Sequence, residues 1–529
     1  MSSKVLSAAI IGLDCELVEV EADISSGLGC FNIVGLPDTA IQESKERIRA
    51  AIKNSGLPFP RTRVTINLAP ANIKKEGPAY DLPIAVSLLL ASGALKTATP
   101  TLPLKISQTP DDYPALTEIP LIPKALFVGE LALDGSLRAI PGILSIALAA
   151  RNFKIKTIYL PKQNAAEAGL VPELEIISVG NLLELVGHLN RQKLIQPYIG
   201  KLPEIVPPKT EDYYDMAYVK GQEHAKRALE IAAAGGHNVL LTGPPGSGKT
   251  LLARTVPSIL PVPTLEEAFE ITRIWSVAGL ITSNGSLITK RPFRNPHHTA
   301  SSVALVGGGT WPRPGEISLA HRGVLFLDEL PEFNRAVLES LRQPLEDGVV
   351  TISRASGTLQ FPAKFILIAA RNPCPCGYFG DPQKNCTCPP SSIYRYQKKI
   401  SGPLLDRIDL HVDVPRVKFE KLTEEKTAET SLKIRERIQA ARDIQSKRFK
   451  NLKIIANSEI VVSQIKEFCQ IDSQTQELLR QATSQFHLSA RAYYRILKIA
   501  RTIADLAGSE KIQVAHLAEA LQYRPKILE

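Results

Sequence analysis

A glycine-rich segment near the middle of the chain has the residue types and spacing of a phosphate-binding loop. It follows the apolar run 239–241 and consists of Gly243, Pro244, Pro245, Gly246, Ser247, Gly248, Lys249 and Thr250. Glycines allow successive backbone N–H groups to point toward one anion, and the start of a following helix adds its positive dipole end. The lysine would meet the outer phosphates of a nucleotide, and the threonine hydroxyl would ligate the accompanying Mg²⁺. A flexible glycine loop is the alternative.

Two adjacent carboxylates, Asp328 and Glu329, end the apolar run 324–327. This run predicts a strand that is buried on both faces of a parallel sheet, and carboxylates at its end are costly to place without a cation. We expect Asp328 to hold the magnesium through a water ligand. Glu329 would activate the water that attacks the γ-phosphate of ATP. A strand-end cap is the alternative interpretation.

Two further residues follow apolar or turn-forming segments and extend this catalytic set. Asn372 ends the run 365–370, and its amide could hold the attacking water, so it resembles the first sensor of AAA+ ATPases. Arg407 lies where this class projects an arginine onto the γ-phosphate of a neighbouring subunit. A local ion pair of Arg407 with Asp406 or Asp409 is the alternative.

The carboxyl-terminal part, 416–529, predicts helices that form a lid over the nucleotide. Arg491 begins a helix that runs through residue 504 and resembles the second sensor, which reaches the phosphates from the lid. Arg495 and Arg501 are lower-ranked candidates for this role. Residues 433–449 carry many cations and no single apolar face, so we expect them to be solvated surface.

Four cysteines lie within fifteen residues as two C-x-C pairs separated by nine residues, namely Cys374, Cys376, Cys386 and Cys388. Four thiolates in one loop can close a tetrahedron about a structural Zn²⁺. Free thiols and redox pairs are the alternatives. Because the cluster follows Asn372 directly, a knob formed here would be placed to touch nucleic acid or a neighbouring subunit.

The composition is that of a soluble globular protein of about three domains. The 529 residues are 44% apolar and 22% charged, and the net charge of +10 would favour polyanions such as nucleic acid. No apolar run is long enough for a membrane span and no export signal is recognisable, so a cytoplasmic protein without membrane contact is expected.

The first 205 residues alternate short β-rich runs with helical ones. Strands are predicted at 18–22 and 62–68, and helices at 38–53 and 81–92. A proline-rich insertion at 97–123 is expected to be a surface loop, and the proline-rich stretch 192–211 a linker. The predicted division is therefore 1–205, an ATPase core at 206–415 with the cysteine-rich insert 372–390, and the helical part 416–529.

Within this first part, residues 75–79, 128–131, 140–142 and 158–164 resemble the proteolytic domain of Lon, a ribosomal S5 domain 2-like fold. In that family the nucleophilic serine follows a Gly-Pro pair, but this chain has Ala79 there. The segment that should bring the lysine base contains no lysine. Because a Ser-Lys dyad needs both groups, we expect a scaffold without peptidase chemistry.

Two other segments each have two alternative interpretations. AAA+ motors place a Gly-Gln element like Gly221 and Gln222 against the adenine, although helix packing explains these residues equally well. The basic, histidine-bearing run 291–298 and the glycine- and tryptophan-bearing run 307–315 lie between the phosphate loop and the carboxylate pair. Loops inserted here in ring motors project into the pore, and such residues could grip a nucleic-acid backbone; purely structural histidines are the alternative.

Several longer motifs together resemble the YifB/ComM family of magnesium-chelatase-like ATPases, over nearly the whole chain. They are the runs 294–300, 314–321, 327–333, 372–377 and 401–410. The resemblance implies an α/β multidomain protein with a Lon-like first domain, an AAA+ P-loop core and a helical lid. It also implies ATP and Mg²⁺ as cofactors, a homo-hexameric ring, and a DNA branch-migration motor in natural transformation, acting on single-stranded or branched DNA with recombination proteins. A magnesium-chelatase motor subunit and, less favoured, an ATP-dependent protease are the alternatives.

Overall fold

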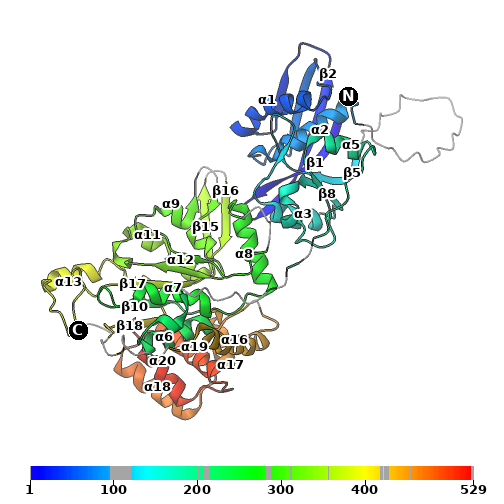
Figure 1. Cartoon of the computed structure of the whole chain (residues 1–529). Helices are drawn as coiled ribbons and strands as arrows, with labels where there is room; N and C mark the ends of the chain where they lie inside the picture. Colours follow the sequence, from blue (N-terminus) through cyan, green and yellow to red (C-terminus); the bar gives the residue numbers. More distant parts are fainter. Residues whose placement is uncertain are drawn as a thin grey trace. The chain divides into compact units, whose positions relative to one another are not determined.

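The computed structural model describes residues 2–95, 121–200, 202–203, 205, 214–281, 287–309, 312–354, 357–417, 421, 428–452 and 454–525. The chain forms two compact units (Figure 1). Unit 1 comprises Met1–Glu204 with Thr272–Leu287, and unit 2 comprises Ile205–Ile271 with Ile288–Glu529. The predicted insertion 97–123 lies outside the described residues up to position 120, and its last three residues instead begin a strand.

Unit 1 is built on a seven-stranded mixed sheet in the order β3-β4-β2-β1-β5-β8-β9. Its strands are β1 (Ser2–Ile11), β2 (Asp14–Ser25), β3 (Phe31–Val34), β4 (Arg63–Ala69), β5 (Leu121–Phe127), β8 (Thr157–Pro161) and β9 (Glu175–Val179), with a hairpin of β6 (Glu130–Leu131) and β7 (Leu137–Arg138). Its helices are α1 (Thr39–Asn54), α2 (Asp81–Ala91), α3 (Ile143–Asn152), α4 (Ala165–Ala168) and α5 (Leu182–Leu189). The predicted strands and helices of this part are confirmed. Helix α2 is buried along its whole length, as its continuous apolar run requires.

Unit 2 contains a five-stranded sheet in the order β11-β14-β17-β10-β18, in which all neighbours are parallel. The strands are β10 (Val239–Thr242), β11 (Phe293–Arg294), β14 (Val324–Leu327), β17 (Ile366–Arg371) and β18 (Leu410–Asp413). Parallel strands are buried on both faces, which explains the unbroken apolar runs of β10, β14 and β17. Their carboxyl ends meet at one edge of the sheet, where the predicted site residues follow.

The remaining elements of unit 2 surround this sheet. They are α6 (Glu223–Gly235), α7 (Lys249–Ile259), α9 (Ser302–Val306), β12 (Gly307–Gly308), β13 (Arg313–Pro314), α10 (Glu316–Leu319), α11 (Arg335–Ser340), α12 (Arg342–Asp347), β15 (Val349–Arg354), β16 (Gly357–Pro362), α13 (Pro390–Gln397), α14 (Gly402–Leu405), α16 (Ser431–Arg448), α17 (Ile465–Phe468), α18 (Ser473–Gln485), α19 (Ala490–Leu506) and α20 (Val514–Gln522). Helix α8 (Leu265–Val277) has residues in both units. None of the helices in the described ranges has the length and apolar character that a membrane crossing needs.

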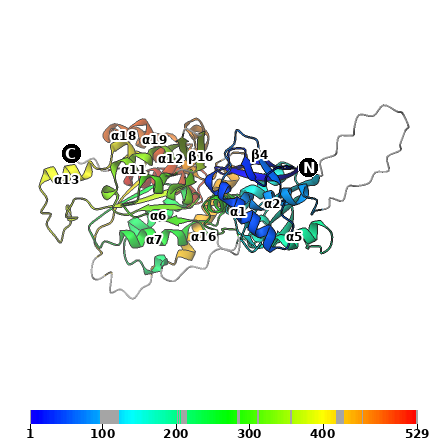
Figure 2. The ribbon, with the colours of Figure 1, turned by 90° about the horizontal axis from the view of Figure 1, so that it is seen from above.

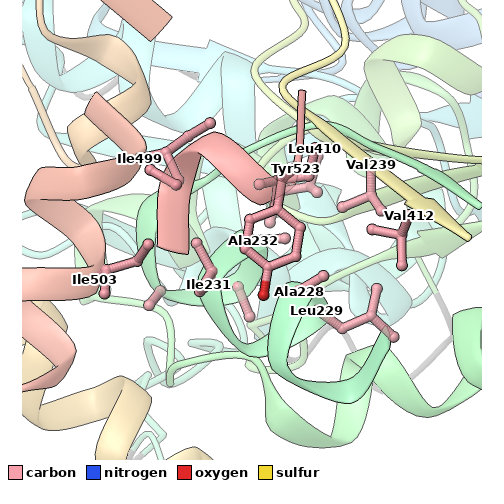
Figure 3. Packing of buried hydrophobic residues seen from close by; sticks show 14 of the residues in the cluster. Ala228, Leu229, Ile231, Ala232, Val239, Leu410, Val412, Ile499, Ile503 and Tyr523 are labelled. Atoms are coloured by element: carbon pink, nitrogen blue, oxygen red, sulfur yellow. The ribbon is translucent and has the colours of Figure 1, made fainter. Parts of the chain in front are cut away.

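The C-terminal helices share one hydrophobic core with the sheet (Figure 3). Ile499 and Ile503 of α19 and Tyr523 pack with α6 and with the strands β10 and β18. Burying these side chains contributes roughly 1.5–3 kcal/mol each. The helical part is therefore anchored to this sheet by apolar burial.

Helix α16 departs from the sequence prediction. The segment 433–449 was expected to be solvated surface, but α16 buries Ile434, Ile438, Ala441 and Gln445 against its neighbours. The apolar stripe is narrow, and the fully buried Gln445 interrupts its pattern. Its amide donates to the carbonyl of Ala234 at 3.1 Å, which satisfies a polar group inside the core.

Candidate nucleotide site

The phosphate loop connects β10 to α7 and is held around its lysine. Gly246 and Gly248 have φ angles of +75° and +93°, which side chains with a Cβ rarely adopt. Lys249 Nζ donates to the carbonyl oxygens of Gly243 and Pro244 at 2.8 Å each, and to Asn372 Oδ1 at 3.2 Å. Burial lowers the pKa of Lys249. A phosphate arriving here would replace these neutral acceptors with a charged one.

The carboxylate pair lies at the same edge of the sheet, because β14 and β10 both flank β17. Thr250 Oγ1 donates to Asp328 Oδ2 at 2.7 Å. A hydroxyl and a carboxylate at this separation are the hard oxygen ligands that Mg²⁺ prefers, so the donor set fits this ion. The structure thus brings together Lys249, Thr250, Asp328 and Asn372, as the sequence predicts.

Glu329 follows Asp328 in the left-handed conformation, with φ of +51°. Its backbone N–H donates to Asp328 Oδ1 at 2.9 Å, and the Glu329 side chain is 57% exposed. His298 Nδ1 lies 3.9 Å from Glu329 Oε2, and its ring packs on those of His297 and Phe333. The proximity of His298 to Glu329 was not predicted. The sequence signal for this contact was the adjacent pair His297 and His298. The spacing of residues along the chain does not show that His298 lies beside Glu329.

Gln222 contacts the phosphate loop from outside. Its amide donates to the carbonyl of Ser247 at 3.3 Å and also to the carbonyl of Pro415. Gln222 itself has φ of +61° at the start of α6. The Gly-Gln element is therefore adjacent to the loop, as a residue near a bound nucleotide must be.

Arg407 and Arg491 lie at the opposite edge of the sheet from Lys249. They line a cavity of 980 Å³ together with residues that immediately precede strands β10, β14 and β18, such as Asn238, Gly323 and Asp409. Four-residue strands separate the two edges by about 13 Å. The structure therefore does not bring Arg491 to the phosphate loop of its own chain, where a second sensor reaching from the lid was expected.

A single carboxylate joins these two arginines. Arg491 Nη2 donates to Glu346 Oε1 at 2.7 Å, and Arg407 Nη2 donates to Glu346 Oε2. The hydrogen bond from Arg407 is the main reason that the pKa of Glu346 is lowered. Arg407 pairs with neither Asp406 nor Asp409, and its Nε is buried with no hydrogen-bond partner in the described part of the chain.

The two lower-ranked arginines have structural roles. Arg495 Nη1 donates to the carbonyls of Asp406 and Ile408 at 3.0 and 2.8 Å. Arg501 pairs with Asp505 and is buried. Because Arg495 lies one turn after Arg491, its bonds hold the start of α19 beside Arg407.

The four clustered cysteines converge in space. Their Sγ atoms lie within 4.8 Å of one another, with 3.3 Å between Cys374 and Cys376 and 3.6 Å between Cys374 and Cys386. Zn–S bonds of 2.3 Å in a tetrahedron place sulfurs about 3.8 Å apart, so the donor set fits zinc. The fourth cysteine, Cys388, accepts a hydrogen bond from the Cys376 backbone.

The cysteine loop packs directly on the phosphate loop. Gly377 has φ of +85°, and a Cβ added there would lie 2.4 Å from Cδ of Pro245. Only glycine permits this approach, because contacts under about 3.0 Å are not tolerated. This contact was not predicted, although the cluster follows Asn372 directly in the sequence.

The basic run 291–298 is less available for binding nucleic acid than its composition indicates, because its two arginines pair with carboxylates. Arg291 makes hydrogen bonds of 3.0 and 2.7 Å with the buried carboxylate of Glu267, and Arg294 makes two of 2.5 and 2.6 Å with Glu316. Both arginines therefore form structural ion pairs within unit 2. Of the second run, 307–315, residues 310 and 311, which include the tryptophan, lie outside the described residues.

A parallel sheet with a phosphate loop, a carboxylate pair at its carboxyl ends and a helical C-terminal part is the architecture of a P-loop ATPase of the AAA+ type. The family described as magnesium chelatase, subunit ChlI, matches residues 215–422, and the C-terminal part of that subunit matches 428–524. A further match, described as subunit ChlI of Mg-chelatase, covers residues 20–104 and 113–164.

Individual relatives extend over the full chain. Competence protein ComM of Haemophilus influenzae is 42% identical over 534 residues, which cover 99% of this chain and 97% of the relative. The YifB protein of Escherichia coli is 41% identical over 533 residues, covering 99% and 97%. A shorter match, 29% identical, joins 28% of this chain to 35% of the ATP-binding subunit ClpX of an ATP-dependent Clp protease from Treponema denticola. The chain belongs to the YifB/ComM family of magnesium-chelatase-like AAA+ ATPases.

Proposed function

We propose that this protein is a ring-forming, ATP-driven DNA motor. The observation that carries the proposal is the distance between the two halves of the nucleotide site. Lys249, Thr250, Asp328 and Asn372 gather at one edge of the sheet, while Arg407 lies at the other. A chain that holds a phosphate loop on one side and a catalytic arginine on the other forms complete sites only when copies are joined side by side.

Different residues perform the separate steps of ATP hydrolysis. The loop amides and Lys249 bind the phosphates, and Thr250 with Asp328 would hold Mg²⁺, which neutralises charge on the β- and γ-phosphates. Glu329 takes a proton from the attacking water, and Asn372 orients that water. Arg407 and Arg491 of a neighbouring copy, presented together by Glu346, stabilise the charge that grows in the transition state.

The assembly that this arrangement favours is a closed homo-hexamer in the cytoplasm. We propose the division into 1–205, 206–415 and 416–529, with the first part a Lon-like domain that lacks peptidase residues. Ala79 has no hydroxyl and lies in a short helical turn, where its carbonyl accepts from the backbone of Gly129 at 3.0 Å. This first domain would serve as a scaffold.

DNA is the proposed substrate of the motor. The net charge of +10 favours a polyanion, and the full-length relative from Haemophilus influenzae bears the name of a competence protein. Work on single-stranded or branched DNA during transformation or recombination, together with recombination proteins, fits both observations. A chelatase-type motor that acts on a protein partner is the second candidate, supported by the matches to magnesium chelatase subunits.

ATP turnover measured with and without DNA separates these two candidates. We expect single-stranded or four-way-junction DNA to raise the rate severalfold over the DNA-free rate, and duplex DNA to act more weakly. A Lys249→Ala chain, which cannot hold the phosphates, controls for contaminating ATPases. Identical turnover with all DNAs and with none would reject the DNA motor and favour the chelatase-type alternative.

Zinc at the four cysteines is proposed as a structural cofactor. Changing Cys386 and Cys388 to Ser is expected to reduce bound zinc from about one ion per chain to none, because two thiolates do not complete a tetrahedral site. Elemental analysis of the purified protein measures this directly. Cys30→Ser is the matched control, since Cys30 is exposed and far along the sequence from the cluster. Wild-type protein without zinc would contradict the assignment.

A further inference from the structure

The segment that carries the cysteine cluster and α13 combines exposed cations with exposed aromatic rings. Lys384, Arg395 and Lys398 are exposed, and none of them pairs with a carboxylate in the described part of the chain. The single acidic residue of the segment 374–399, Asp381, is already engaged by Arg416 at 2.8 Å. Figures 1 and 2 both show α13 standing at the outer margin of unit 2.

Aromatic rings alternate with these cations. Phe379 and Tyr394 are 42% and 60% exposed. Lys398 Nζ lies 4.2 Å from the centre of the Tyr394 ring, and Lys384 Nζ lies 4.1 Å from that of Tyr378. Such rings are costly to expose and are unnecessary for binding a carboxylate-rich peptide. They are, however, the partners on which nucleotide bases stack beside cations that track the phosphates.

We propose that segment 374–399 is a binding surface for single-stranded nucleic acid. This inference rests on the proposed function, because it gives the DNA motor a contact site outside the loops between the phosphate loop and the carboxylate pair. The four clustered cysteines hold the two parts of the segment together, and the Lys398–Tyr394 and Lys384–Tyr378 pairs would be its contacting groups.

The same segment reaches the catalytic centre. Lys399 Nζ lies 3.2 Å from Glu332, and both line a 450 Å³ cavity with Glu329 and Asn372. Gln397 donates to the carbonyl of Pro373, the residue after Asn372, at 3.1 Å. A strand bound on this surface therefore acts on the residues that orient the attacking water. Nucleic-acid binding would be coupled to turnover through these contacts.

Binding of a fluorescent single-stranded oligonucleotide to the full chain, measured by anisotropy across a salt series, tests the surface. Lys384→Gln with Lys398→Gln should weaken binding and reduce the salt slope by about 1.4, or about 0.7 per lost phosphate contact. Tyr394→Leu should weaken binding roughly fivefold or more with no change in slope. Lys447→Gln with Lys450→Gln, which removes two exposed cations elsewhere, should bind as the unsubstituted chain does.

The outcomes separate this inference from the proposed function. If the unsubstituted chain binds no DNA, both are overturned. If it binds and both the Lys384/Lys398 and the Tyr394 variants match the Lys447/Lys450 control, only the surface is overturned. Polyglutamate that competes as well as DNA at equal charge would show that the surface takes an acidic protein segment instead. A circular dichroism spectrum and melting curve like those of the unsubstituted chain establish that each variant is folded.

Discussion

Glu329→Gln is expected to bind ATP with unchanged affinity and to hydrolyse it roughly 10²- to 10⁴-fold more slowly. The amide keeps the shape of the side chain but cannot accept the proton of the attacking water. The Glu329 side chain is exposed and lines a cavity together with Asn372. Asp328 instead bonds to Thr250. We therefore expect the two carboxylates to have separate functions although they are adjacent in sequence.

Two measurements are needed for this variant: equilibrium binding of a fluorescent ATP analogue, and steady-state phosphate release. Glu339→Gln is a suitable control, since it removes the same charge from α11 at a residue that pairs with Arg342 and hydrogen-bonds with Ser401. Turnover by Glu329→Gln within threefold of the unsubstituted chain would refute the general-base role. Loss of nucleotide binding would show that Glu329 acts in holding the nucleotide instead.

Arg407→Ala is expected to reduce turnover by about 10³-fold, the low end for an arginine that stabilises phosphoryl transfer. The decisive feature is that the loss should be repaired in trans. A Lys249→Ala chain has no working phosphate loop but still offers Arg407 to its neighbour. Mixed with Arg407→Ala chains, it should restore activity, because some interfaces then join an intact loop to an intact arginine.

Phosphate release by the two variants, alone and mixed in varying ratio, measures this complementation. Arg480→Ala controls for loss of an exposed arginine, since within the described residues Arg480 pairs only with Glu477 on α18. Mixtures that stay as inactive as their components, in assemblies shown to exchange chains, would contradict a shared site. Arg491→Ala should also lower turnover and be repaired in trans, as expected for Arg407→Ala, because Glu346 holds both side chains.

Much of the fold was predictable because the signals are local. Helix α2 and strands β10, β14 and β17 consist almost entirely of apolar residues, and such runs have few alternatives when they are bounded by glycine or by polar residues. The segment of α16 was misjudged for the opposite reason. Its buried stripe includes Gln445, whose burial depends on a backbone carbonyl that α6 supplies from over 200 positions away.

The phosphate loop, the carboxylate pair and Asn372 can be identified from the sequence alone, because each follows a parallel strand and the carboxyl ends of such strands meet at one edge of the sheet. The sequence also shows four cysteines close enough along the chain for their thiols to converge at one site. Tertiary structure alone decided where Arg491 lies. Arg495, one turn later, bonds to the carbonyls of Asp406 and Ile408, so the start of α19 is fixed beside Arg407 and away from Lys249. It likewise decided that the cysteine loop rests on Pro245, since that contact depends on two loops that follow neighbouring strands of the folded sheet.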